Sequence, residues 1–75
     1  MTVLVIDDER SNRAILRAAL GAWGCTVEAF ERADGAIQAA PRVAPDLVLL
    51  DWRLPGLAGA DAVRALRACT DAPIV

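Results

Sequence analysis

Three aspartates carry the chemistry that this sequence could perform. Asp7 and Asp8 stand directly after the apolar run Thr2–Ile6, and Asp51 stands directly after a second apolar run, Leu47–Leu50. A single aspartate after a strand is most often a turn former or a helix cap. A doublet and a singlet that both follow apolar runs form a two-part pattern that chance loops seldom reproduce. The pattern therefore indicates one shared acidic site.

The chemistry of such a site follows from its charge. If the two runs are neighbouring parallel strands, the doublet and Asp51 lie about 5 Å apart, which is one inter-strand spacing. Like charges at that distance repel, so the cluster is expected to keep a proton or to hold a cation. Carboxylates without histidine or thiolate ligands favour Mg²⁺, with Mn²⁺ as its substitute. Mg²⁺ leaves room for a phosphoryl group, and Asp51 is the natural nucleophile to accept it as a mixed anhydride.

Parallel strands are needed to position these carboxylates. Thr2–Ile6 is rich in β-branched residues, and the uninterrupted apolar run Leu47–Leu50 is typical of a strand covered on both faces of a parallel sheet. Cys25–Phe30 alternates apolar and polar residues, which predicts an edge strand. Pro73 introduces Ile74 and Val75 as the start of a fourth strand.

Three helices are predicted between these strands. Ser11 is the expected N-cap of the first helix and Gly24 its stop. Ala33–Ala40 is a short second helix that ends before a loop carrying two prolines, and Ala60–Cys69 is the third. The predicted inward faces are Ile15, Leu16, Ala19, Leu20 and Trp23 in the first helix, and Ala62, Val63, Leu66 and Cys69 in the third. The order β-α-β-α-β-α-β predicts an α/β fold with helices on both faces of a parallel sheet.

Composition limits the class of protein. The 75 residues make at most one small domain, and ten acidic residues against eight arginines, with no histidine, disfavour direct contact with nucleic acid or an anionic membrane. Cys25 and Cys69 form no CxxC pair and are expected to be small buried hydrophobes in a reduced, cytosolic setting. The N-terminus has no basic region and no long apolar stretch, which predicts neither a signal peptide nor a membrane span.

The segments "VLVIDDERSNR", "LVLLDWRLPGLAG" and "APIV" resemble the receiver domain of response regulators in two-component signalling. The resemblance runs over essentially all of residues 1–75 and implies a flavodoxin-like doubly wound parallel sheet, a fold for which a receiver is a standard example. It also implies a receiver domain that is incomplete at its C-terminus, truncated after the start of the fourth strand. The implied function is a cytoplasmic phosphorelay switch, not an enzyme.

Carried over residue by residue, the resemblance makes Asp51 the phosphoacceptor, which a sensor histidine kinase or a phosphotransfer protein phosphorylates. Asp8 becomes a direct Mg²⁺ ligand, Asp51 is a ligand of the same ion, and Asp7 completes the acidic pair, mainly through water. Arg53 would give its backbone carbonyl to the metal, while its side chain tunes dephosphorylation. Leu54 replaces a methionine that is frequent in the family. The family also uses a Ser or Thr after the fourth strand and a Lys after the fifth, which these residues do not supply, and a downstream output domain is a further expectation.

Three alternatives stay open on the sequence alone. A phosphohydrolase of the haloacid dehalogenase type also uses an aspartate nucleophile, but its two acids are separated by one residue, whereas Asp7 and Asp8 are adjacent. A flavodoxin-like FMN binder would need a first loop that cradles phosphate, and the acidic "DDE" would repel it. A receiver-like interaction module without phosphorylation is the third.

The unfinished fourth strand further predicts low stability and self-association through an open sheet edge.

Overall fold

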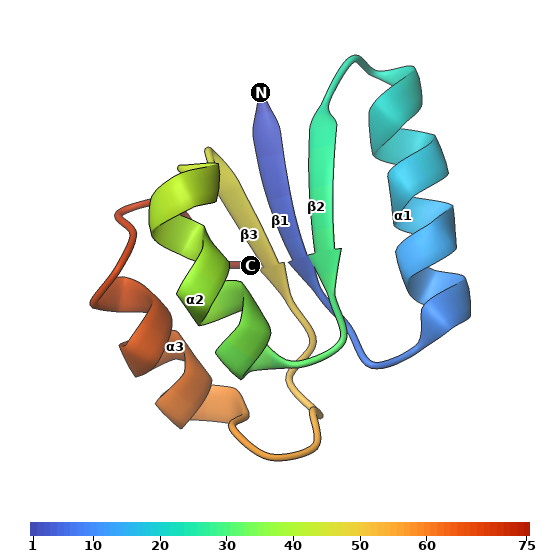
Figure 1. Cartoon of the computed structure of the whole chain (residues 1–75). Coiled ribbons are helices and arrows are strands. Elements are labelled where there is room, and N and C mark those ends of the chain that lie inside the picture. The colour runs from blue at the N-terminus through green and yellow to red at the C-terminus, as the bar shows by residue number, and fades with distance from the viewer.

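A three-stranded parallel sheet forms the centre of the molecule (Figure 1). The computed structural model describes all residues 1–75. The strands are β1 (Thr2–Ile6), β2 (Thr26–Phe30) and β3 (Leu47–Leu50), and they lie in the order β2-β1-β3. β1 is therefore the central strand, and it pairs with β3, which is the condition on which the predicted acidic site depends.

Helices cover both faces of this sheet, as the βαβ order predicts. α1 (Arg10–Ala22) lies on one face, and α2 (Ala33–Val43) and α3 (Gly59–Arg67) lie together on the other (Figure 1). None of the three helices has the length and the apolar run needed to cross a bilayer.

The predicted start of a fourth strand lies beside β3. Ile74 forms an isolated parallel bridge with Val48. The Val48 N–H donates to the Pro73 carbonyl at 2.8 Å, and the Leu50 N–H donates to the Val75 carbonyl at 2.9 Å. The strand order with this segment added agrees with the doubly wound sheet that the sequence predicts.

The core lies between the sheet and the α2–α3 face. Val3, Leu4, Val5 and Ile6 of β1 are all buried, because neighbouring strands cover both edges of β1 and helices cover both of its faces. All four buried residues of α2 are alanines, so this helix can approach the sheet closely. From α3, Ala62 and Leu66 are fully buried, which confirms the predicted inward face of the third helix. The remaining core residues are Ala33, Ala36, Ala39, Ala40, Val48, Leu54 and Ala72.

The other face of the sheet is covered less completely. α1 has no buried residue. Leu16 and Leu20 are half-buried, but Ile15 is 64% exposed and Trp23 is 82% exposed. The predicted apolar face of the first helix therefore packs on the sheet through only part of its residues, since the side chains at its margins reach solvent.

Two predicted helix boundaries are wrong. Ser11 is not the N-cap of α1: the N-cap is Glu9, and the Asp7 carboxylate turns the chain by accepting the Glu9 N–H at 2.9 Å, so the helix begins before Ser11. α2 does not end at Ala40 but continues through Pro41 to Val43. A proline in the last turn removes only one N–H and has a φ suited to a helix, so the helix can continue past it.

Smaller differences affect the ends of the other elements. Ala44 ends α2 in the left-handed conformation, and its N–H donates to the Ala40 carbonyl at 2.8 Å. α3 runs from Gly59 to Arg67, one residue earlier at its start and two residues earlier at its end than predicted. β2 begins at Thr26, one residue later than predicted. Cys25 and Cys69 are free and half-buried.

The buried position of β1 predicts a difference between two chemically identical substitutions. Ile6→Val removes one methyl group from a fully buried side chain, so it should lower the free energy of unfolding by about 0.5–1.5 kcal/mol. Ile15→Val makes the same change on the exposed surface of α1 and should alter the free energy of unfolding by less than about 0.5 kcal/mol. Urea denaturation followed by circular dichroism measures both, and equal losses in the two variants would contradict this description of the core.

Candidate metal and phosphoryl site

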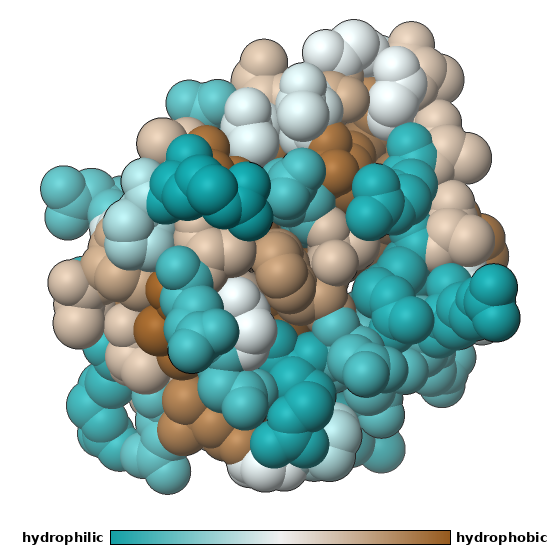
Figure 2. Space-filling model, viewed as in Figure 1, coloured by the Kyte–Doolittle hydropathy of each residue, from teal (hydrophilic) through white to brown (hydrophobic).

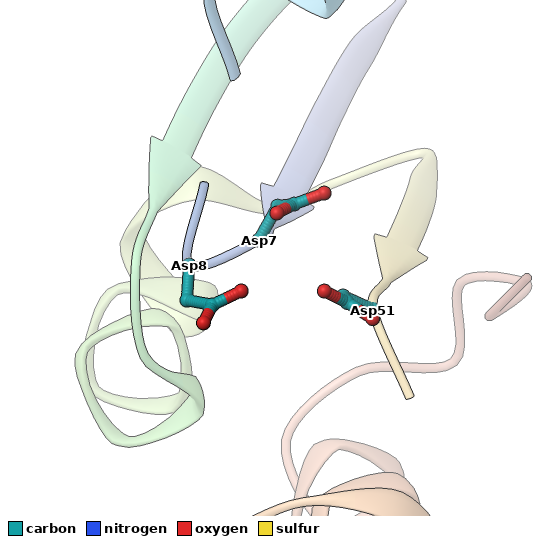
Figure 3. Close-up of side chains that lie close together, drawn as sticks. All are labelled: Asp7, Asp8 and Asp51. Carbon is teal, nitrogen blue, oxygen red and sulfur yellow. The ribbon is translucent and has the colours of Figure 1, made fainter. Parts of the chain in front are cut away.

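The three aspartates meet at the edge of the sheet where the strands end. One carboxylate oxygen from each of Asp7, Asp8 and Asp51 lies within 4.8 Å of the others. Figure 3 shows the first two side chains on the segment that follows β1 and the third on the segment that follows β3. The structure therefore brings together the three carboxylates that the sequence predicts to share a site, while their roles as ligands and as phosphoacceptor stay predictions.

The register of the sheet is the reason for this meeting. Ile6 is the Cα partner of Leu50, so β1 and β3 end at the same level. The Asp51 N–H donates to the Ile6 carbonyl at 2.9 Å, and the Asp7 N–H donates to the Phe30 carbonyl at 3.0 Å. Both aspartates thus continue the hydrogen-bonded ladder by one residue, and their backbones are fixed by the sheet.

The Asp7 carboxylate is occupied by donors from its own segment. Its Oδ1 accepts the Glu9 N–H at 2.9 Å, and its Oδ2 accepts from Asn12 Nδ2 at 3.3 Å. Sequence reasoning missed Asn12; the available signal was an amide on the first turn of the helix, five residues after the first aspartate. Because both oxygens already accept hydrogen bonds, this half-buried carboxylate suits a contact with a metal through water better than a direct one.

Asp8 and Asp51 have free oxygens. The exposed Asp8 carboxylate forms no hydrogen bond and no ion pair, and Figure 3 shows it pointing toward Asp51. Asp51 is half-buried, and only its Oδ1 accepts a hydrogen bond, from the Arg53 backbone N–H at 3.0 Å. These two side chains therefore offer unbonded oxygens to the space between them. The Arg53 carbonyl as a further ligand stays a prediction.

The loop after Asp51 folds back on itself. Leu54 is buried and anchors it, while Gly56 and Gly59 adopt positive φ angles of 76° and 55°, which favour glycine. A Cβ added at Gly59 would lie 3.4 Å from the indole ring of Trp52, so this ring packs directly on the start of α3. Trp52 is still 63% exposed, which leaves its emission sensitive to events at the neighbouring aspartate.

An open cavity of about 260 Å³ adjoins the aspartates on the α1 side of the sheet. Its polar end is formed by Asp7, Asn12 and Asp51, and its walls are apolar. The lining residues are Val5, Ile6, Asp7, Asn12, Leu16, Leu49, Leu50, Asp51 and Val75. At about 30 Å³ for each water, this space admits several solvent molecules beside the carboxylates.

The donor set fits Mg²⁺. It consists of hard carboxylate oxygens, and no side-chain cation forms an ion pair with any of the three aspartates. No ion pair within the protein therefore offsets the repulsion among these carboxylates, and a divalent cation would offset it. Strongly hydrophilic residues also gather at the lower right of the molecular surface in Figure 2, where α1 begins, so this side of the molecule is polar.

Comparison with known proteins gives consistent results. The model of the response regulator receiver domain family matches residues 3–75. The chain is 40% identical over 73 residues to the DNA-binding response regulator MtrA of Mycobacterium tuberculosis, an alignment that covers 97% of this chain. The chain spans only 32% of the length of that relative.

Two solved structures are similar in fold and in sequence. The BeF3-activated N-terminal receiver domain of RstA from Klebsiella pneumoniae superposes with a TM-score of 0.89 at 34% identity, covering 99% of this chain and 63% of that one. A structure of the histidine kinase ThkA in complex with the response regulator protein TrrA gives a TM-score of 0.86 at 31% identity, covering 97% of this chain and 64% of that one. These similarities confirm the predicted fold class and the predicted family.

Metal binding can be tested through Trp52 in a Trp23→Phe background, which removes the other tryptophan. Mg²⁺ should change the emission of this protein with saturation, and Asp8→Asn should weaken the affinity at least about tenfold, because a negatively charged ligand becomes a neutral amide. Asp71→Asn is the matched control, since Asp71 is an exposed aspartate that forms no hydrogen bond or ion pair. Identical Mg²⁺ responses in the Asp8→Asn and Asp71→Asn variants would contradict the assignment.

Proposed function

Because the chain belongs to the response regulator receiver domain family, we propose that it is a phosphoacceptor switch in which Asp51 takes a phosphoryl group from a histidine kinase or a phosphotransfer protein, with Mg²⁺. The observation that carries the proposal is the pair of free carboxylate oxygens that Asp8 and Asp51 direct at one space. One is suited to hold a cation and the other to act as a nucleophile.

The proposed reaction needs little beyond positioning. A free carboxylate oxygen of Asp51 attacks the phosphorus of a phosphohistidine, and the bond between phosphorus and the imidazole nitrogen breaks as the new P–O bond forms. The electron pair of the broken bond stays on the leaving imidazole. The product on this chain is a mixed anhydride, the aspartyl phosphate.

The residues around Asp51 prepare it for this attack. The Arg53 N–H holds one of its oxygens at 3.0 Å, which restricts the rotation of the carboxylate and leaves the second oxygen without a hydrogen bond. Mg²⁺, when bound, would neutralise charge on the transferring phosphoryl oxygens. Asp8 and Asp51 would be its carboxylate ligands, and Asp7 would contribute through water, because the Asp7 oxygens already accept hydrogen bonds.

The partners are part of the same proposal. ThkA bound to TrrA supports a histidine kinase as the phosphoryl donor, and the name of MtrA supports an output that binds DNA through another part of the protein. Direct nucleic-acid contact by these residues is not proposed, since their net charge is −2. The family is a signalling domain, so the chain is proposed to catalyse at most its own phosphorylation and dephosphorylation, in the cytoplasm.

Phosphorylation can be tested with acetyl phosphate as a small donor. Wild type should gain the mass of one phosphoryl group only when Mg²⁺ is present, and beryllofluoride should bind under the same condition. Asp51→Asn should abolish both, whereas Asp71→Asn should change neither. Mass spectrometry then locates the adduct.

Two results would count against this function. An adduct located on Asp7 would show that the wrong carboxylate has been assigned. Continuous release of phosphate from small esters, without a stable adduct, would instead favour a phosphohydrolase, and the absence of any adduct despite Mg²⁺ binding would favour an interaction module.

A further inference from the structure

The direction of the Asp8 side chain depends on its backbone. Its carboxylate is exposed and forms no hydrogen bond and no ion pair, so no side-chain contact holds it in place. Figure 3 nevertheless shows it aimed at Asp51. The backbone on either side of Asp8 sets the direction of its Cα–Cβ bond, and so the region that the carboxylate reaches.

Two hydrogen bonds flank that backbone. The Asp7 carbonyl oxygen accepts from Arg13 Nη1 at 2.7 Å, and the Glu9 N–H donates to Asp7 Oδ1 at 2.9 Å. Because a peptide unit is planar, the first bond fixes the peptide that joins Asp7 to Asp8, and the second fixes the peptide that joins Asp8 to Glu9. Both rotations next to the Asp8 Cα are thereby restricted.

The Arg13 contact is suited to this task. Arg13 is half-buried, and its own N–H donates to the Glu9 carbonyl at 3.1 Å. The first turn of α1 therefore holds Arg13 close to the loop that contains Asp7 and Asp8. A guanidinium donor forms a stronger hydrogen bond with a carbonyl than a neutral donor does. Arg17, one turn further along α1, makes a comparable contact with the Val27 carbonyl at 3.2 Å, but on β2 and away from the aspartates.

We propose that Arg13 is a positioning residue for the acidic site, because its guanidinium orients the peptide between Asp7 and Asp8 and so aims the Asp8 carboxylate at the space shared with Asp51. The inference rests on the proposed function, since it deepens the account of the same Mg²⁺ site. It assigns a task to a side chain that touches neither the metal space nor the phosphoacceptor.

A positioning role for Arg13 and a purely electrostatic role predict opposite changes in the affinity for Mg²⁺ when the guanidinium is removed. Removing a positive charge near three carboxylates would by itself strengthen the binding of a cation. Removing a positioning contact lets the Asp8 carboxylate turn away from Asp51, and this weakens the binding of the cation. A contact that merely ties α1 to the loop would lower stability and leave the affinity for Mg²⁺ unchanged.

The test compares Arg13→Ala with Arg17→Ala, both made in the Trp23→Phe background and followed through Trp52 emission. Arg13→Ala should weaken Mg²⁺ affinity by about three- to tenfold, and Arg17→Ala should leave it within about twofold, although each removes one arginine bond to a backbone carbonyl. Urea denaturation of each variant shows whether it is folded.

A second variant and a metal-free measurement keep the test decisive if Arg13→Ala does not fold. Arg13→Lys retains the charge and one donor, so its affinity should lie between those of Arg13→Ala and wild type. In NMR spectra without metal, Arg13→Ala or Arg13→Lys should shift the Asp7 carbonyl carbon and the Asp8 amide nitrogen, because these atoms share the peptide that Arg13 holds.

The outcomes separate the two proposals. Mg²⁺ binding by wild type with equal or tighter binding by both Arg13 variants overturns the role of Arg13 and leaves the proposed function intact. Weaker binding by the Arg13 variants with unchanged binding by Arg17→Ala supports the role. No Mg²⁺ binding by wild type overturns the positioning role together with the metal assignment.

Discussion

The in-register pairing of β1 with β3 is the constraint on which the site depends. Ile6 lies opposite Leu50, so the chain leaves both strands at the same level, and the next residue in each case is an aspartate. Burial of β1 on all sides favours this register, because a slip of one residue would exchange the side chains that pack on its two faces and disrupt the fit on both. Packing in the core thus holds carboxylates together that would otherwise separate.

The consequence is a local concentration of negative charge in which none of the three carboxylates forms an ion pair with a protein cation. The chain controls these carboxylates through hydrogen bonds from N–H donors: Glu9 and Asn12 occupy Asp7, and Arg53 holds one oxygen of Asp51. Asp8 is left free, with its backbone restrained on both sides. This division of tasks leaves two carboxylates available to a cation and a phosphoryl group, while the third shapes the loop.

The sequence was sufficient to predict the α/β order and the three aspartates at one edge of the sheet, because apolar runs and the acids that follow them are local patterns. It was not sufficient for the start of α1, where the Asp7 side chain turns the chain before Ser11, or for the end of α2, which continues past Pro41. Both depend on contacts that periodicity does not encode. The roles of Asn12 and Arg13 were invisible for the same reason, since they arise only when the helix is placed over the loop.

Stability with and without a divalent cation tests the central claim, which is that the fold forces together carboxylates that repel one another. In a metal chelator, Asp8→Asn should melt at a higher temperature than wild type, because it removes one repelling charge and breaks no hydrogen bond. Added Mg²⁺ should raise the melting temperature of wild type and have little effect on this variant. Equal melting temperatures in chelator, with no response of either protein to Mg²⁺, would contradict the account.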